Sequence, residues 1–234
     1  MRSALGLQRS VVVQASAYGL DNRGVEEALR RDPHNVRGVV VAKADVSDTQ
    51  MDDWHRLGVR GMRFIMSGQL GGTVGIDDLI ALAPRLAARG WHGEILPRED
   101  EWDDVLPVLS RLPCSLVIDH LGGVHADVDD PGPLAALDYL LGEGRTWLKL
   151  IGYRLSKDPL DPRLVARAQR FYRRAPQRMV WGSDWPHVGM SEPHDAGALL
   201  NAFASWFDHD EAVLSEVLAA NPQSLFQFPT DVDA

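Results

Sequence analysis

The sequence is poor in cysteine and has no long apolar segment. Cys114 is the one cysteine among 234 residues, so the chain cannot form an internal disulfide, which fits a reducing compartment. No run of about 18 apolar residues occurs, so we expect no membrane-spanning helix and no membrane partner. Residues 1–7 are too short and too weakly apolar to be a signal peptide. Together these absences predict a cytoplasmic protein.

Lysine is also scarce, and the charge balance is acidic. The formal net charge is −9, and only Lys43, Lys149 and Lys157 are lysines. No block of lysines or arginines occurs, and nucleic-acid binding needs such a basic patch. We therefore expect no nucleic-acid partner. A hydrophobic content of 45% in a chain of this length is enough for one large core.

Short apolar runs alternate with helical patterns along the chain. Strand-like runs occupy residues 11–14, 36–42, 61–66, 91–96, 116–120, 147–151 and 179–181. Helical patterns occupy residues 25–31, 49–57, 76–88, 101–109, 134–141, 162–174, 196–206 and 210–220, with Asp100, Asp161 and Asp210 as candidate N-caps. Near-continuous Val, Ile and Leu runs between amphipathic helices indicate parallel strands covered by helices. The sequence therefore predicts an α/β, TIM-like (β/α) barrel of seven strand–helix units, with one domain over residues 1–228 and a flexible tail over 229–234.

Polar residues recur where the predicted strands end, whereas no glycine-rich phosphate-binding fingerprint follows any strand. The polar residues at strand ends are Gln14, Ser16, Asp45, Arg63, Asp119, His120, Lys149 and Asp184. A (β/α) barrel carries its active site at the carboxyl ends of its strands. These side chains are therefore the candidates for binding and catalysis.

The segment Met-Val-Trp-Gly-Ser-Asp-Trp-Pro-His (179–187) places one carboxylate, Asp184, at the end of a short buried strand. Aspartate is a poor strand residue, and burying its charge without a partner is costly. One interpretation makes Asp184 a general base or metal ligand, and the other makes it the cap of the following turn. The segment alone does not separate these two interpretations.

Two further strand-end residues each have a structural and a functional interpretation. His120 is either a hydrogen-bonded structural histidine or a group that polarises a substrate carbonyl or binds metal. Arg63 lies between Met62 and Phe64 in a strand pattern. It either binds substrate or forms an internal salt bridge, for which Asp45 and Asp119 are candidates.

Six segments, spread in order over nearly the whole chain, resemble one known family. They are Val-Val-Gln-Ala-Ser-Ala-Tyr-Gly (12–19), Asp-Asn-Arg (21–23), Gly-Val-Arg-Gly-Met-Arg-Phe (58–64), Val-Ile-Asp-His-Leu-Gly (117–122), Leu-Lys-Leu-Ile-Gly-Tyr-Arg-Leu-Ser (148–156) and Trp-Gly-Ser-Asp-Trp-Pro-His (181–187). The chain is thereby similar to the amidohydrolase-related proteins, in the branch of the 2-pyrone-4,6-dicarboxylate lactonases. The resemblance implies a distorted (β/α)8 barrel that hydrolyses C–O or C–N bonds.

The resemblance also implies roles for individual residues. Asp184 matches the family's general base, and His120 matches its sixth-strand histidine. By motif, Ser16, Arg63 and Arg154 match residues that hold an anionic substrate, because a guanidinium pairs well with a carboxylate. From their places on the neighbouring loops we add Tyr18 and His187 as candidate substrate-binding residues. Many family members hold one divalent metal, often zinc, whereas the lactonase branch can work without metal.

The sequence departs from the family pattern at four places. No His-x-His occurs, although the family's first strand carries one, so we expect a barrel that lacks this strand. Leu96, Gln69 and Gly123 stand where the family often has a histidine or an arginine. A zinc site would thus have only His120 and Asp184 as ligands, fewer than the three protein ligands of a catalytic zinc.

Two functional hypotheses follow. The first is a lactonase-like hydrolase in which Asp184 activates water and His120 polarises the carbonyl of a small substrate bearing a carboxylate. The second is a truncated, catalytically silent barrel that serves as a binding or scaffold protein. A missing strand would expose sheet edges, so we also expect self-association into a homo-oligomer.

Overall fold

The computed structural model describes residues 2–65, 74–128, 130–190 and 194–230. These residues form two compact units. The N-terminal unit contains residues 2–96, 111–117 and 223–230, and the C-terminal unit contains residues 97–110 and 118–222. Gln69, and all of the predicted tail after Thr230, lie outside the described residues.

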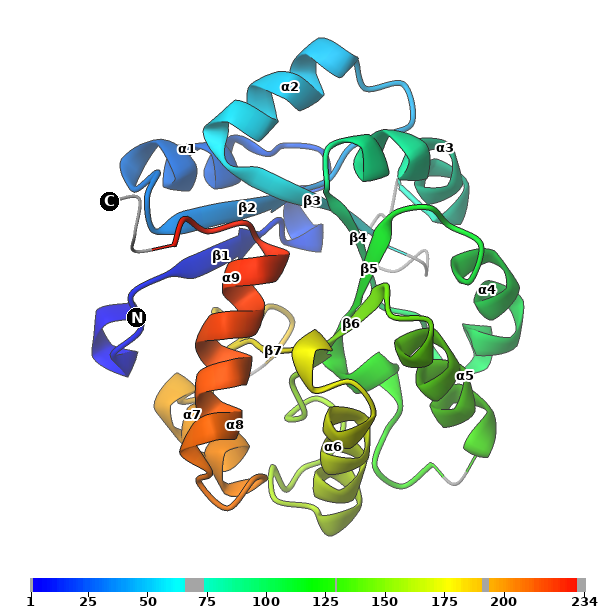
Figure 1. Cartoon of the computed structure of the whole chain (residues 1–234), viewed down its shortest axis with the longest axis vertical. Helices are drawn as coiled ribbons and strands as arrows, with labels where there is room; N and C mark the ends of the chain where they lie inside the picture. Colours follow the sequence, from blue (N-terminus) through cyan, green and yellow to red (C-terminus); the bar gives the residue numbers. More distant parts are fainter. Residues whose placement is uncertain (1, 66–73, 129, 191–193, 231–234) are drawn as a thin grey trace. The chain divides into compact units, whose positions relative to one another are not determined.

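The N-terminal unit is a parallel sheet with helices packed on it (Figure 1). Its strands neighbour one another in chain order: β1 (Ser10–Val13), β2 (Val36–Val40), β3 (Val59–Phe64), β4 (His92–Ile95) and β5 (Ser115–Ile118, whose last residue belongs to the other unit). Between them lie the helices α1 (Arg23–Arg31), α2 (Asp48–Leu57) and α3 (Ile76–Ala88). Every residue of β2 is buried, as expected for a strand covered on both faces. Leu29, Met51 and Leu82 are fully buried and bring the three helices onto this core.

The C-terminal unit repeats the same alternation. Parallel strands β6 (Thr146–Leu150) and β7 (Met179–Trp181) are neighbours, and Leu148 pairs with Met179. The helices are α4 (Trp102–Leu109), α5 (Pro131–Gly142), α6 (Pro162–Arg174), α7 (Ala196–Ser205) and α8 (Glu211–Ser215), followed by a π-helix (Glu216–Ala220) and by α9 (Asn221–Leu225), which runs on into the other unit. Leu137, Leu164 and Phe171 are fully buried and form its core with Leu148.

The predicted fold class is confirmed: over the described residues, seven strands of an α/β, TIM-like fold alternate with helices in the expected order. Asp161 and Asp210 cap α6 and α8, and each carboxylate accepts backbone N–H groups of the first helical turn. Asp100 is not a cap; it lies inside the short 3-10 turn Glu99–Glu101, and Glu101 is the N-cap of α4. The predicted helix over 210–220 is also interrupted, because its second half is the π-helix.

Close packing between β3 and β4 gives a prediction about stability. A Cβ at Gly61 would lie 2.4 Å from His92 Nε2, and the His92 side chain is 1% exposed, so it has no room to move away. We expect Gly61→Ala to lower the free energy of unfolding by about 1–3 kcal/mol, measured by urea denaturation. Gly24→Ala is the control: nothing lies within 4 Å of its Cβ, and alanine favours the helix. Equal urea midpoints for the two variants would contradict this account.

Candidate functional site

The C-terminal unit brings together the two residues expected to carry the chemistry. His120 follows β5, Asp184 follows β7, and His120 Nε2 lies 3.9 Å from Asp184 Oδ2. Both residues have positive φ, 46° for His120 and 54° for Asp184, so each strand ends in a sharp left-handed turn. The His120 side chain is 6% exposed, whereas that of Asp184 is 27% exposed. Solvent can therefore reach the carboxylate while the imidazole is largely enclosed.

One oxygen of Asp184 is held by two neighbouring donors. The Tyr153 hydroxyl donates to Asp184 Oδ2 at 2.5 Å, and Arg154 Nε donates to the same oxygen at 2.7 Å. A second nitrogen of Arg154 donates to the backbone carbonyl of Val188 at 2.9 Å. Oδ1 makes no hydrogen bond to another residue within the described chain. The predicted substrate-binding residue Arg154 thus contacts the candidate base itself.

His187 supports the loop that carries Asp184. Its backbone N–H donates to the carbonyl of Asp184 at 2.8 Å, and its Nε2 lies 3.1 Å from the carbonyl oxygen of Ser183. The imidazole is 2% exposed and packs edge-on against the ring of Tyr153. His187 thus has a structural role in the loop, and its role as a candidate substrate-binding residue stays a prediction.

The charges around Asp184 and His120 favour an ionised carboxylate beside a neutral imidazole. Burial lowers the pKa of His120 from its ordinary value of 6.5, and nearby Asp119 and Asp184 only partly oppose this. Burial raises the pKa of Asp184, but a positive charge on His120 and hydrogen bonds from Tyr153 and Arg154 outweigh it, so the net shift is downward. Because His120 is neutral at neutral pH, Tyr153 and Arg154 provide most of this stabilisation there.

Tyr153 remains a hydrogen-bond donor over the working pH range. Burial, followed by its hydrogen bond to Asp184, raises the pKa of its hydroxyl. The ring is 6% exposed and packs against the imidazoles of His187 and His194. Tyr153 is not among the site residues predicted from the sequence, although it lies directly before Arg154 in the Gly-Tyr-Arg segment.

A buried ion pair lies next to the histidine. Lys149 Nζ, on β6, is 2.5 Å from Asp119 Oδ1, and both side chains are almost fully enclosed. Asp119 directly precedes His120, so the pair fixes the end of β5 from which the imidazole projects. Lys149, one of the polar residues expected at a strand end, is thus held in an ion pair beside the candidate site.

The other predicted substrate-binding residues belong to the N-terminal unit. Ser16 and Tyr18 form a short 3-10 turn after β1, and Tyr18 is 69% exposed. Arg63 donates to the carbonyl of Gln14 at 3.4 Å, and its Nε lies 3.9 Å from Glu94 Oε1. Glu94 was not among the acids considered as partners for Arg63. The roles of Ser16, Tyr18 and Arg63 in substrate binding stay predictions.

The described residues do not by themselves fit a catalytic zinc site. Over residues 2–65, 74–128, 130–190 and 194–230, no three His, Cys, Asp or Glu side chains are placed to share a metal ion. A catalytic zinc takes three protein ligands, whereas His120 and Asp184 supply two. Oδ2 of Asp184 is moreover occupied by Tyr153 and by the cation Arg154.

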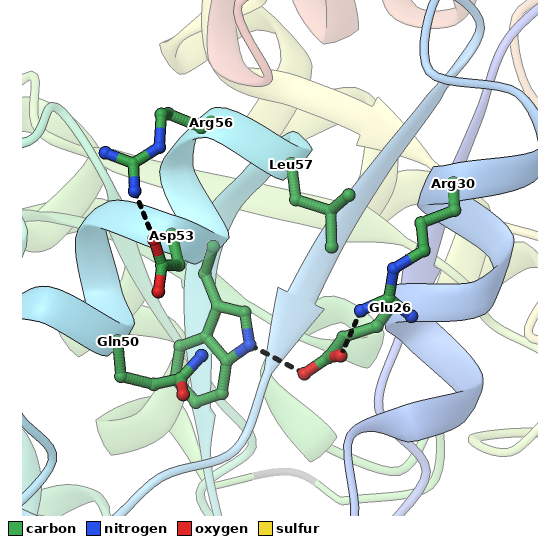
Figure 2. A pocket seen from close by; sticks show the side chains of 7 residues that line it. Glu26, Arg30, Gln50, Asp53, Arg56 and Leu57 are labelled. Atoms are coloured by element: carbon green, nitrogen blue, oxygen red, sulfur yellow. Dashed lines mark hydrogen bonds and ion pairs between the residues drawn. The ribbon is translucent and has the colours of Figure 1, made fainter.

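A surface pocket of about 510 Å³ lies between α1 and α2, and none of the predicted site residues lines it (Figure 2). Its lining residues are Glu26, Arg30, Gln50, Asp53, Trp54, Arg56 and Leu57. Glu26 accepts from both Arg30 and Trp54, and Arg56 pairs with Asp53. Because its charged side chains already pair within the pocket, it offers no unpaired charge to a ligand. None of the helices in the described part of the chain combines the length and apolarity needed to cross a membrane.

The chain is similar to known proteins over almost its whole length. The sequence model of one family, described as Amidohydrolase, matches residues 1–228. The chain is 30% identical to the 2-pyrone-4,6-dicarboxylate hydrolase of Comamonas testosteroni, over 99% of this chain and 80% of the relative. It is also 30% identical to the 4-sulfomuconolactone hydrolase of Rhizobium radiobacter, over 95% of this chain and 76% of the relative.

Solved structures show the same fold. A Pseudomonas putida protein assigned as a 2-pyrone-4,6-dicarboxylic acid hydrolase superposes with a TM-score of 0.84. The two chains are 30% identical, and the alignment covers 98% of this chain and 85% of the other. The match thus includes both compact units and the segments around His120 and Asp184.

Proposed function

This chain belongs to the amidohydrolase family, and we propose that it is a lactone hydrolase with Asp184 as general base and His120 as the group that polarises the carbonyl. The observation that carries the proposal is the approach of His120 Nε2 to within 3.9 Å of Asp184 Oδ2, at the ends of two strands. The relatives named as hydrolases of two different lactones support the reaction class.

In the proposed reaction, Asp184 accepts a proton from a water molecule, whose oxygen attacks the lactone carbonyl carbon. Negative charge develops on the carbonyl oxygen, and His120 Nε2–H donates a hydrogen bond to it. When the tetrahedral intermediate collapses, the ring C–O bond breaks. Asp184 returns its proton to the departing oxygen, and the product is the hydroxy acid. No step requires a group other than water, substrate and these two side chains.

Burial of His120 selects the ring nitrogen that carries its proton. Nδ1 is buried and has no hydrogen-bond partner among the described residues, whereas Nε2 faces Asp184. A neutral imidazole has one N–H donor, and burying that donor unpaired costs about 1–3 kcal/mol. The proton therefore belongs on Nε2, which is the nitrogen that the mechanism needs as a donor.

The substrate class is inferred from the relatives. Both relatives are named for anionic lactones, one a dicarboxylate and one a sulfonated compound. We propose a small lactone that bears an anionic group. A panel of carboxylated, sulfonated and uncharged lactones, assayed for ring opening by ultraviolet absorbance, tests this. Hydrolysis of the uncharged lactones alone would contradict the substrate class, and no turnover on any lactone would favour the silent barrel.

The pH dependence of kcat/KM should reflect the lowered pKa values of both groups. The mechanism needs Asp184 ionised and His120 neutral; protonated His120 would instead form an ion pair with the base. Because both pKa values lie below their ordinary values, 3.8 and 6.5, activity should persist as pH falls through 6.5. A pH profile of kcat/KM checks this. An acid limb centred at or above pH 6.5 would show that His120 is not the buried neutral group described here.

A further inference from the structure

We infer that Tyr153 and Arg154 are positioning residues for the base: they hold Oδ2 of Asp184 and leave Oδ1 as the atom that takes the proton from water. Both donors reach the same oxygen, at 2.5 Å and 2.7 Å. A carboxylate with one oxygen fixed by two donors cannot rotate freely about its terminal bond, so the second oxygen keeps one direction. This inference rests on the proposed function, because the direction of Oδ1 matters for a reaction in which Asp184 takes a proton from water.

The two donors are themselves held in place. The Tyr153 ring is 6% exposed and packs edge-on against His187, which in turn donates its backbone N–H to Asp184. Arg154 joins Asp184 to the carbonyl of Val188, four residues further along the same loop. The segment after β6 and the loop after β7 are thus joined by several contacts. Together these contacts fix the orientation of the Asp184 carboxylate.

This arrangement gives Arg154 a different role from the one that its motif suggests. A substrate-binding arginine would use its guanidinium on the substrate anion, and its loss would raise KM with kcat unchanged. A positioning arginine acts on the base, so its loss lowers kcat with KM almost unchanged. The two roles are therefore separable by steady-state kinetics.

The kinetic test uses the variants Tyr153→Phe, Arg154→Met and Arg154→Lys on a lactone that the wild type hydrolyses. We expect Tyr153→Phe and Arg154→Met each to lower kcat by about 10- to 100-fold, with KM within about twofold, because displacement of a catalytic group lowers the rate steeply. Arg154→Lys should recover only part of kcat, since an ammonium keeps the charge but cannot make both contacts. An increase in KM of tenfold or more with kcat retained would overturn the inference.

Matched controls in the same unit remove the same groups from the surface. Tyr139 in α5 is 51% exposed, and Arg170 in α6 makes a surface ion pair with Asp138. Tyr139→Phe and Arg170→Met should leave kcat and KM unchanged, since exposed ion pairs contribute little. A loss of kcat in these controls equal to that of the site variants would overturn a specific role for Tyr153 and Arg154.

A structural test decides the inference whether or not any lactone is hydrolysed. In a crystal structure of the double variant Tyr153→Phe/Arg154→Met, the Asp184 carboxylate should rotate or occupy two conformers, while the backbone of β7 is unchanged. A single conformer in the wild-type orientation would overturn the inference. Failure of the lactone panel together with a displaced carboxylate would reject the proposed function and leave the positioning role intact.

Discussion

Asp184→Asn should lower kcat for lactone hydrolysis by about 10²- to 10⁴-fold, because an amide cannot accept the proton that water gives up. Asparagine has nearly the same shape, and its side-chain oxygen can still accept from Tyr153 and Arg154. We therefore expect KM to stay within a few-fold of wild type. Steady-state kinetics on any lactone hydrolysed by the wild type gives both constants.

Asp127→Asn is the matched control for this variant. Asp127 is an exposed aspartate of the C-terminal unit, so the same change of charge there should leave kcat unaltered. The melting temperatures of both variants show whether the fold is kept. Turnover of folded Asp184→Asn at the wild-type rate would exclude Asp184 as the base and leave its salt bridge with Arg154 as a structural contact.

Much of this fold was predictable because buried positions in strands and helices are mostly occupied by apolar residues, whose spacing is visible in the sequence. The run Val36–Val40 is buried along its whole length, and three of its five residues are valines, with Arg37 as its one charged residue. Two helices, Ile76–Ala88 and Pro162–Arg174, have the predicted bounds, because apolar spacing runs through both and Asp161 caps the start of the second. The π-helix Glu216–Ala220 was not predictable. Its backbone hydrogen bonds span one residue more than those of an α-helix, and over five residues this hardly changes the spacing of the apolar side chains.

The sequence predicted the site residues that follow the ends of strands, but not the contacts that the loops make with them. In parallel strands, residues after the carboxyl ends meet at one edge, so the proximity of His120 and Asp184 follows from topology. The contacts of Tyr153 and Arg154 depend instead on the path of two loops and on the positive φ of Asp184. Arg63 shows the same limit: a charged partner was expected, but Glu94 was not identified as that partner.

His120→Asn should lower kcat by about 10²- to 10³-fold, the usual effect of removing one oxyanion donor. Asparagine is suited to this position because it tolerates the left-handed backbone, where φ is 46° at His120. It keeps an N–H donor, but its shorter side chain ends well before the place that Nε2 occupies. The expected loss of kcat therefore results from a side-chain N–H that is too short to contact the substrate oxygen, and not from strain in the turn.

His125→Asn provides the matched control, because His125 is exposed and lies five residues further along the same unit. The Lys149–Asp119 ion pair, at 2.5 Å, should keep the end of β5 in place in either variant, so the melting temperature of His120→Asn should stay close to wild type. If His120 were only a structural residue, its removal would lower the melting temperature while kcat of the folded fraction stayed the same. A loss of kcat at an unchanged melting temperature is the outcome expected of a donor that acts on the developing charge.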